Sequence, residues 1–328
     1  MNIKFKSSLS SNKTLTVLSL LCLLFGAVGI VAGDVVLPII IATLSLIFLF
    51  DQEKRVFSKI AVIGLLIFNA VGFFFNTVFL YGPEGIILAF LLLKCLRTKK
   101  SKAETAVMMT GIVSLFIVAT FVIIPFSAGG ADSLSDVAVY YEELISALRD
   151  VFVSSAMEIY KPLFEGSGME ISESLVTSLF NQQLSMIISY VVIVAFATVG
   201  ITMKIFEAIL SRLAERKDVI SNWRFMTSNV FAYFYVGLMI LAIFSSSSGG
   251  VLGIAIGNLY NIFMIVYAYV GFNYALALLS TRLKPSFAII LMVVASILAL
   301  SLVLQLFAAF GVLFTIRKNR ELAPGEEA

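Results

Sequence analysis

The residues best suited to chemistry are four asparagines inside apolar stretches. Asn69 and Asn76 are seven residues apart and share one face of a helix, and Asn258 and Asn261 share a face of another. An amide left unpaired in hydrocarbon costs about 1–3 kcal/mol. We therefore expect these side chains to face protein or a wet cavity. Two hypotheses stay open: hydrogen-bonding contacts between helices, or a polar site for a small solute, which in its sharpest form is one site shared by all four.

The composition removes most enzymatic chemistry. The sequence has no histidine, so the commonest metal ligand and the usual general base near neutral pH are missing. Cys22 and Cys95 are too few and too far apart for a disulfide framework or a thiolate metal cage. No Walker loop, dinucleotide fingerprint or HExxH motif is present. We expect no enzyme and no catalytic, metal or cofactor-binding residue.

The apolar content predicts an all-α, polytopic transmembrane bundle whose main partner is the lipid bilayer. Of the 328 residues, 60% are hydrophobic and 13% are charged, against roughly 45–50% and about 25% in soluble domains. A span needs about 20 residues, and a retained first helix is preferred to a cleaved signal. We expect eight or nine spans, from stretches at residues 14–33, 35–50, 57–80, 85–96, 105–127, 184–203, 225–244, 251–280 and 286–314.

The basic residues indicate topology. They collect before the first stretch, around residues 54–59, around 97–102 and at 204–224, whereas the loops around Asp34 and Glu84 have none. This pattern predicts a cytoplasmic N-terminus, and short clusters of this kind suggest no nucleic-acid partner. The tail with Arg317, Lys318 and Arg320 does not fit, because nine spans would put it outside.

One acidic segment separates two groups of spans. We divide the chain into N-terminal transmembrane helices at residues 1–128, an extracytoplasmic amphipathic segment at 129–183, C-terminal transmembrane helices at 184–316 and a polar tail at 317–328. The middle segment predicts a helix broken near Pro162 and at residues 166–168, then a second helix from Ile171. It is either a hairpin resting on the membrane surface or a lid or docking element over a membrane cavity.

Glycines on single helix faces predict close packing. Gly26, Gly29 and Gly33 fall in one arc of the first helix, and Gly253, Gly257 and Gly271 share a face of the 251–280 helix. Small residues on one face let helices approach closely in lipid. The approaching helix belongs either to this chain or to another membrane subunit.

Residues 184–320 resemble the YybS-like family of bacterial predicted membrane proteins. The resemblance rests on Leu210-Ser211-Arg212-Leu213-Ala214-Glu215-Arg216, Asn222-Trp223-Arg224-Phe225, Gly257-Asn258-Leu259-Tyr260-Asn261 and Phe310-Gly311-Val312-Leu313-Phe314-Thr315-Ile316-Arg317-Lys318. The family is distantly similar to substrate-binding subunits of energy-coupling-factor transporters and to membrane proteins of cell shape. It implies a multi-pass protein of the bacterial cytoplasmic membrane, either a solute transporter or substrate-binding transporter subunit, or a scaffold or assembly factor for an envelope or division complex.

Overall fold

The computed structural model describes most of the chain from residue 55 onward. The described ranges are 16–21, 55–74, 81–98, 100–164, 171–213, 227–245, 250–284 and 300–322, with the single residues Leu24, Thr43, Ser45, Leu46, Phe225, Phe287, Ile290, Leu291, Met292 and Val294. Gly26, Gly29, Gly33 and Asn76, which carry sequence predictions, lie outside these residues.

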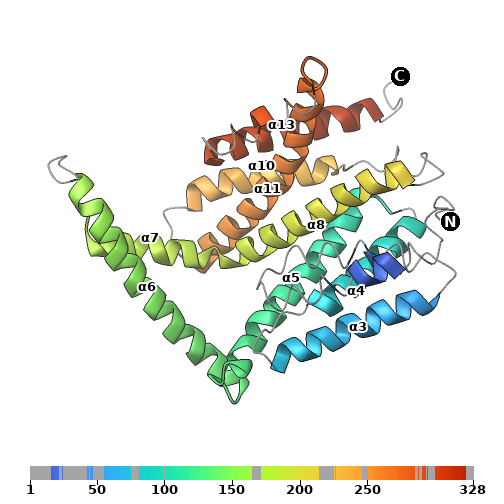
Figure 1. Cartoon of the computed structure of the whole chain (residues 1–328). Coiled ribbons are helices and arrows are strands. Elements are labelled where there is room, and N and C mark those ends of the chain that lie inside the picture. The colour runs from blue at the N-terminus through green and yellow to red at the C-terminus, as the bar shows by residue number, and fades with distance from the viewer. Residues whose placement is uncertain are drawn as a thin grey trace. The chain divides into compact units, whose positions relative to one another are not determined.

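The described elements are helices, and these residues contain no strand (Figure 1). The all-α fold is therefore confirmed for this part of the chain. The helices are α3 (Arg55–Phe74), α4 (Tyr81–Arg97), α5 (Lys102–Ser127), α6 (Leu134–Phe164), α7 (Glu173–Ser185), α8 (Ile187–Leu213), α10 (Asn229–Ser245), α11 (Val251–Leu279) and α13 (Leu300–Leu322).

Four helices within the described residues are long and apolar enough to cross a membrane. They are Lys102–Ser127, Ile187–Ala208, Val251–Leu279 and Leu302–Asn319, and shorter apolar helices run over Val56–Phe68 and Asn229–Ser245. Stretches 14–33 and 35–50 fall mostly outside the described residues. The count of eight or nine spans therefore stays a prediction.

The chain divides into two compact units. Unit 1 comprises residues 1–100, 104–187 and 194–222, and unit 2 comprises residues 101–103, 188–193 and 223–328. This division follows contacts, whereas the predicted domains were defined by position relative to a membrane. Those predicted boundaries remain untested.

In unit 1, α3 packs against α4. Ala61 and Leu65 are buried on α3, and Leu88, Ala89 and Leu92 are buried on α4. Other large apolar side chains of α3 stay exposed, among them Ile60, Ile63 and Ile67. Such one-sided burial is typical of a helix that packs on protein with one face and on lipid with the other.

The end of α5 is set by glycine. Gly129 has a φ of +70°, a left-handed conformation that glycine adopts without strain. The Gly130 N–H donates to the Pro125 carbonyl at 2.9 Å and the Gly129 N–H to the Phe126 carbonyl at 3.4 Å. These two bonds form a Schellman motif, which ends the helix and satisfies two of its last carbonyls.

A proline in α5 creates the link to α6. Pro125 has no N–H, so the carbonyl of Phe121, four residues earlier, has no helical donor. The Tyr141 hydroxyl from α6 donates to that carbonyl at 2.6 Å. The Phe121 and Tyr141 rings also meet edge to face, with centroids 6.3 Å apart. The bond fixes the start of α6 beside the end of α5.

Asp136 supplies one half of a capping box at the start of α6. The Asp136 carboxylate accepts from the Ser133 N–H at 2.8 Å, the Ser133 hydroxyl at 2.8 Å and the Asp132 N–H at 3.1 Å. These bonds, the Ser133 hydroxyl first, hold the pKa of Asp136 below its usual value. They satisfy backbone donors that a helix start leaves free.

Helices α6 and α7 form a hairpin in unit 1 (Figure 1). The Phe152 and Phe180 rings join them at 5.5 Å between centroids. Pro162 does not break α6 but lies in its last turn, two residues before the helix ends at Phe164. The helix therefore ends slightly later than the break predicted near Pro162. It can continue because Pro162 removes only one helical hydrogen bond, the one to the carbonyl of exposed Glu158.

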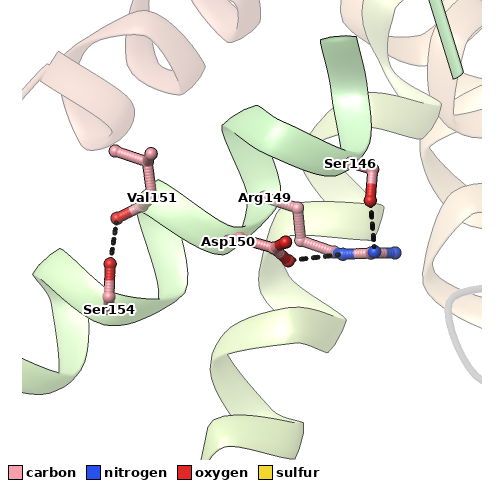
Figure 2. A network of polar contacts seen from close by, with 5 residues as sticks. All are labelled: Ser146, Arg149, Asp150, Val151 and Ser154. Carbon is pink, nitrogen blue, oxygen red and sulfur yellow. Dashed lines mark hydrogen bonds and ion pairs between the residues drawn. The ribbon is translucent and has the colours of Figure 1, made fainter. Parts of the chain in front are cut away.

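The polar side of α6 is held by short-range contacts (Figure 2). Arg149 Nη2 donates to Ser146 Oγ at 3.0 Å, and Arg149 Nε lies 3.7 Å from Asp150 Oδ1. The Ser154 hydroxyl donates to the Val151 carbonyl at 3.0 Å. All three contacts join residues of one helix, so they leave the exposed apolar side chains of α6 uncovered. Those side chains include Leu144, Leu148, Val151, Ile159 and Leu163.

We predict that Tyr141→Phe lowers the unfolding free energy by about 0.5–1.5 kcal/mol, because the Phe121 carbonyl loses its donor. Thermal unfolding in detergent measures the change. In a Pro125→Ala background the helix supplies an N–H to that carbonyl, so Tyr141→Phe should cost less there. An equal cost in both backgrounds would contradict the proline-dependent role of Tyr141.

Candidate functional site

Helices α11 and α13 cross in unit 2 with their backbones in direct contact. A Cβ on Gly271 would collide with the Phe307 carbonyl, and a Cβ on Gly311 would collide with the Tyr267 carbonyl. The two backbones therefore touch, which only glycine permits at both positions. Ala268 and Ala308 are buried with them. The helix face predicted from Gly271 meets α13 of the same chain.

Three stacked tyrosines pack beside this crossing, one from α10 and two from α11. The Tyr235 ring stacks between Tyr260 at 5.8 Å and Tyr267 at 5.2 Å, measured between centroids. Tyr267 is fully buried. This core of unit 2 consists of Ala232, Tyr235, Tyr267, Ala268, Ala308 and Val312. It is closely packed by side chains on three helices.

A polar cluster closes one end of the same three helices. Asn319 Nδ2 donates to the Thr227 carbonyl at 3.0 Å and to Asn229 Oδ1 at 2.9 Å. The Thr227 hydroxyl lies 3.4 Å from the hydroxyls of Tyr267 and Thr315. These contacts tie α13 and α11 to the residues that lead into α10. Sequence reasoning missed this cluster, because Asn319 lies in the predicted polar tail whereas α13 continues to Leu322.

Asn258 is a buried bridge within unit 2. It is 5% exposed; its Oδ1 accepts from the Ser189 N–H at 2.8 Å and its Nδ2 donates to the Ile254 carbonyl at 2.9 Å. Ser189 is the third residue of α8, where an N–H has no acceptor within the helix. Asn258 therefore completes the start of α8 from α11, which favours the contact hypothesis for this residue.

The other predicted site residues are placed less specifically. Asn261 is half-buried on α11, as are Gly253 and Gly257, and Asn69 belongs to α3. Asn69 is in unit 1 and Asn258 in unit 2. Asn76 lies outside the described residues, and the shared-site hypothesis remains a prediction.

Unit 1 contains buried hydroxyls of a different kind. Among the described residues, Thr43 Oγ1, Thr110 Oγ1 and Ser114 Oγ are buried without a hydrogen-bond partner. Two buried threonines of α8 bond back to the carbonyl four residues earlier, Thr198 to Val194 and Thr202 to Thr198. Sequence reasoning missed Thr110 and Ser114, because single hydroxyls in an apolar stretch give no pattern.

Comparison with known proteins decides the family. A family model described as predicted membrane protein matches residues 14–313. The chain belongs to this family, DUF2232. The membership confirms the resemblance to YybS-like membrane proteins and supports a position in the lipid bilayer. Searches of curated proteins and of solved structures found no significant match.

We predict opposite effects for two glycines of unit 2. Gly271→Ala should lower the thermal unfolding temperature, because its Cβ meets backbone that no rotamer can move, and overpacking costs about 1–3 kcal/mol. Gly237→Ala on α10 is the matched control; its Cβ meets nothing within 4 Å, and alanine favours a helix by about 1 kcal/mol. Equal effects of the two substitutions would contradict the backbone contact.

We predict that Asn258→Leu lowers the unfolding free energy by about 0.6–2 kcal/mol, since it leaves the Ser189 N–H without an acceptor. Asn273→Leu serves as the control, because Asn273 Nδ2 donates to the Tyr269 carbonyl of its own helix. Thermal unfolding in the same detergent compares them. A loss no larger than that of the control would remove Asn258 from its bridging role.

Proposed function

We propose that this family member is a solute transporter, or the substrate-binding subunit of one, in the bacterial cytoplasmic membrane. The observation that supports it is the pair of unpartnered hydroxyls on α5, Thr110 Oγ1 and Ser114 Oγ. They stand four residues apart on one face of a helix that is long and apolar enough to span a membrane.

The argument rests on what a buried hydroxyl needs. A hydroxyl without a partner costs free energy in an apolar interior. The helix itself offers a carbonyl four residues back, as the Thr120 hydroxyl uses at 2.9 Å from Phe116 on the same α5. Thr110 and Ser114 do not take this bond. A water or a polar solute between helices would satisfy them, and binding such a solute is the first step of transport.

The alternative function is a scaffold for an envelope or division complex. It is supported by the exposed apolar side chains on the α6–α7 hairpin, which include Leu144, Leu148, Val151 and Leu179. Large exposed apolar patches often mark interaction sites. Proteins that co-purify in mild detergent separate the two functions: a transport ATPase and a coupling membrane subunit favour transport, and envelope-synthesis proteins favour the scaffold.

We predict that a water-soluble solute stabilises the purified protein through Thr110 and Ser114. A thermal-shift panel of vitamins, amino acids and nucleosides tests this, since a solute at 100 times its dissociation constant adds about 2.7 kcal/mol. Thr110→Val and Ser114→Ala should abolish the shift while leaving the unliganded protein as stable as before. Thr198→Val is the control, because that hydroxyl bonds to its own helix. A hit that survives both substitutions would contradict the proposed site.

We propose a cytoplasmic N-terminus, with residues 129–183 outside the cytoplasmic membrane. Single cysteines at Ser101, just before α5, and at Ser133, just before α6, test this topology once Cys22 and Cys95 are replaced by alanine. An impermeant thiol reagent should label intact cells at position 133 and only lysed cells at position 101. The reverse labelling pattern would mean that the membrane topology is the opposite of the one proposed.

A further inference from the structure

Glu84 is buried at the start of a helix, although the sequence predicts it in a loop. The sequence places it in a short loop between two apolar stretches, yet it lies in the first turns of α4 and is 3% exposed. Leu88, Leu92 and Cys95 follow it at helical spacing and are also buried. The carboxyl therefore stands at the head of the apolar packing face of α4.

The carboxyl of Glu84 has an oxygen without a partner. Among the described residues, none hydrogen-bonds to Glu84 Oε1. The neighbouring helix α3 packs against α4. The charged residues of α3, Arg55 and Lys59, stand near its start, away from Glu84. Residues 75–80 join the end of α3 to the start of α4, so Lys59 is roughly 20 Å from the α3 end nearest Glu84. On α4 itself the next charge is Lys94, which is exposed.

A buried carboxyl in this setting is neutral or accompanied by a cation. Desolvation disfavours the ionised form, and the charged residues of α3 and α4 described above stand away from it. The first turn of a helix favours a nearby negative charge, but only weakly. A proton is the smallest cation that neutralises the group, and it needs no further ligands. Ionisable groups buried among membrane helices often take part in proton or ion pathways.

We propose that Glu84 is a proton-binding site inside unit 1, holding a proton at neutral pH and exchanging it with solution. The inference deepens the proposed function and rests on it for one point, the use of that proton to drive solute movement. Binding itself involves only the carboxyl: the Glu84 carboxylate takes up a proton, and the neutral acid releases it again.

Dicyclohexylcarbodiimide is the probe, because this apolar reagent modifies protonated carboxyls in apolar surroundings. The full-length protein in detergent is treated between pH 6 and pH 9, and mass spectrometry of its peptides counts the adduct on each acid. The exposed α6 acids Glu142 and Glu143 are internal controls. Glu84→Gln, which keeps the shape but cannot react, confirms the assignment of the adduct.

We expect at least about tenfold more adduct at Glu84 than at Glu142 or Glu143 at pH 7, since each unit of pKa difference changes the protonated fraction about tenfold. The adduct should fall as the pH rises and should be the same in sodium chloride and in choline chloride. Labelling of Glu84 no greater than that of the control acids would overturn the proposal. Protection by sodium at fixed pH would also overturn it, in favour of a metal-cation site. If Glu84 is labelled as expected but no solute stabilises the protein in the thermal-shift panel, the proton site is supported and the transport function is not.

Discussion

Buried polar atoms of this protein must find hydrogen-bond partners away from bulk water, and this constraint governs the rest of the structure. In a bilayer every buried donor and acceptor must be satisfied by protein or by something the protein binds. Helices satisfy most of the backbone. The exceptions are helix starts and prolines. Asn258 accepts from a buried N–H at the start of α8, and Tyr141 donates to the carbonyl that Pro125 leaves without a donor, at an exposed position.

The two units answer the constraint differently. In unit 2 the backbones of α11 and α13 touch at Gly271 and Gly311, and the polar groups near the crossing bond to each other. In unit 1 three buried hydroxyls and one carboxyl oxygen, all on described residues, lack a partner. Close packing suits a rigid support, whereas unpartnered polar atoms suit a place that binds something else. This contrast is why the proposals for solute and proton binding both fall in unit 1.

The sequence predicts the helices well, because apolar runs of sufficient length leave few other structures in lipid. The runs at 105–127 and 251–280 match α5 and α11 closely. Helix partners are harder to predict. A small-residue face at Gly271 shows that something approaches, but not that it is Gly311 on α13. The limits of α13 are also missed, since its last turns are polar and hold the bonds of Asn319.

The sequence also does not predict the position of Glu84. Its sequence neighbours Gly82 and Pro83 indicate a loop, whereas in the structure Glu84 is buried in the first turn of α4. Thr110 and Ser114 carry no periodic signal either. Their importance depends on bonds that they do not form, and a missing bond is visible only once neighbouring atoms have positions.

The most direct test of this account is an experimental density map of the protein in a lipid nanodisc, at a resolution that shows ordered water. We predict non-protein density within about 3.5 Å of Thr110 Oγ1 and Ser114 Oγ, enclosed by helices and separate from the surrounding lipid. Hydroxyls that instead bond back to the carbonyls of Ala106 and Thr110, or that face lipid tails, would contradict the claim that unit 1 is built to bind a solute.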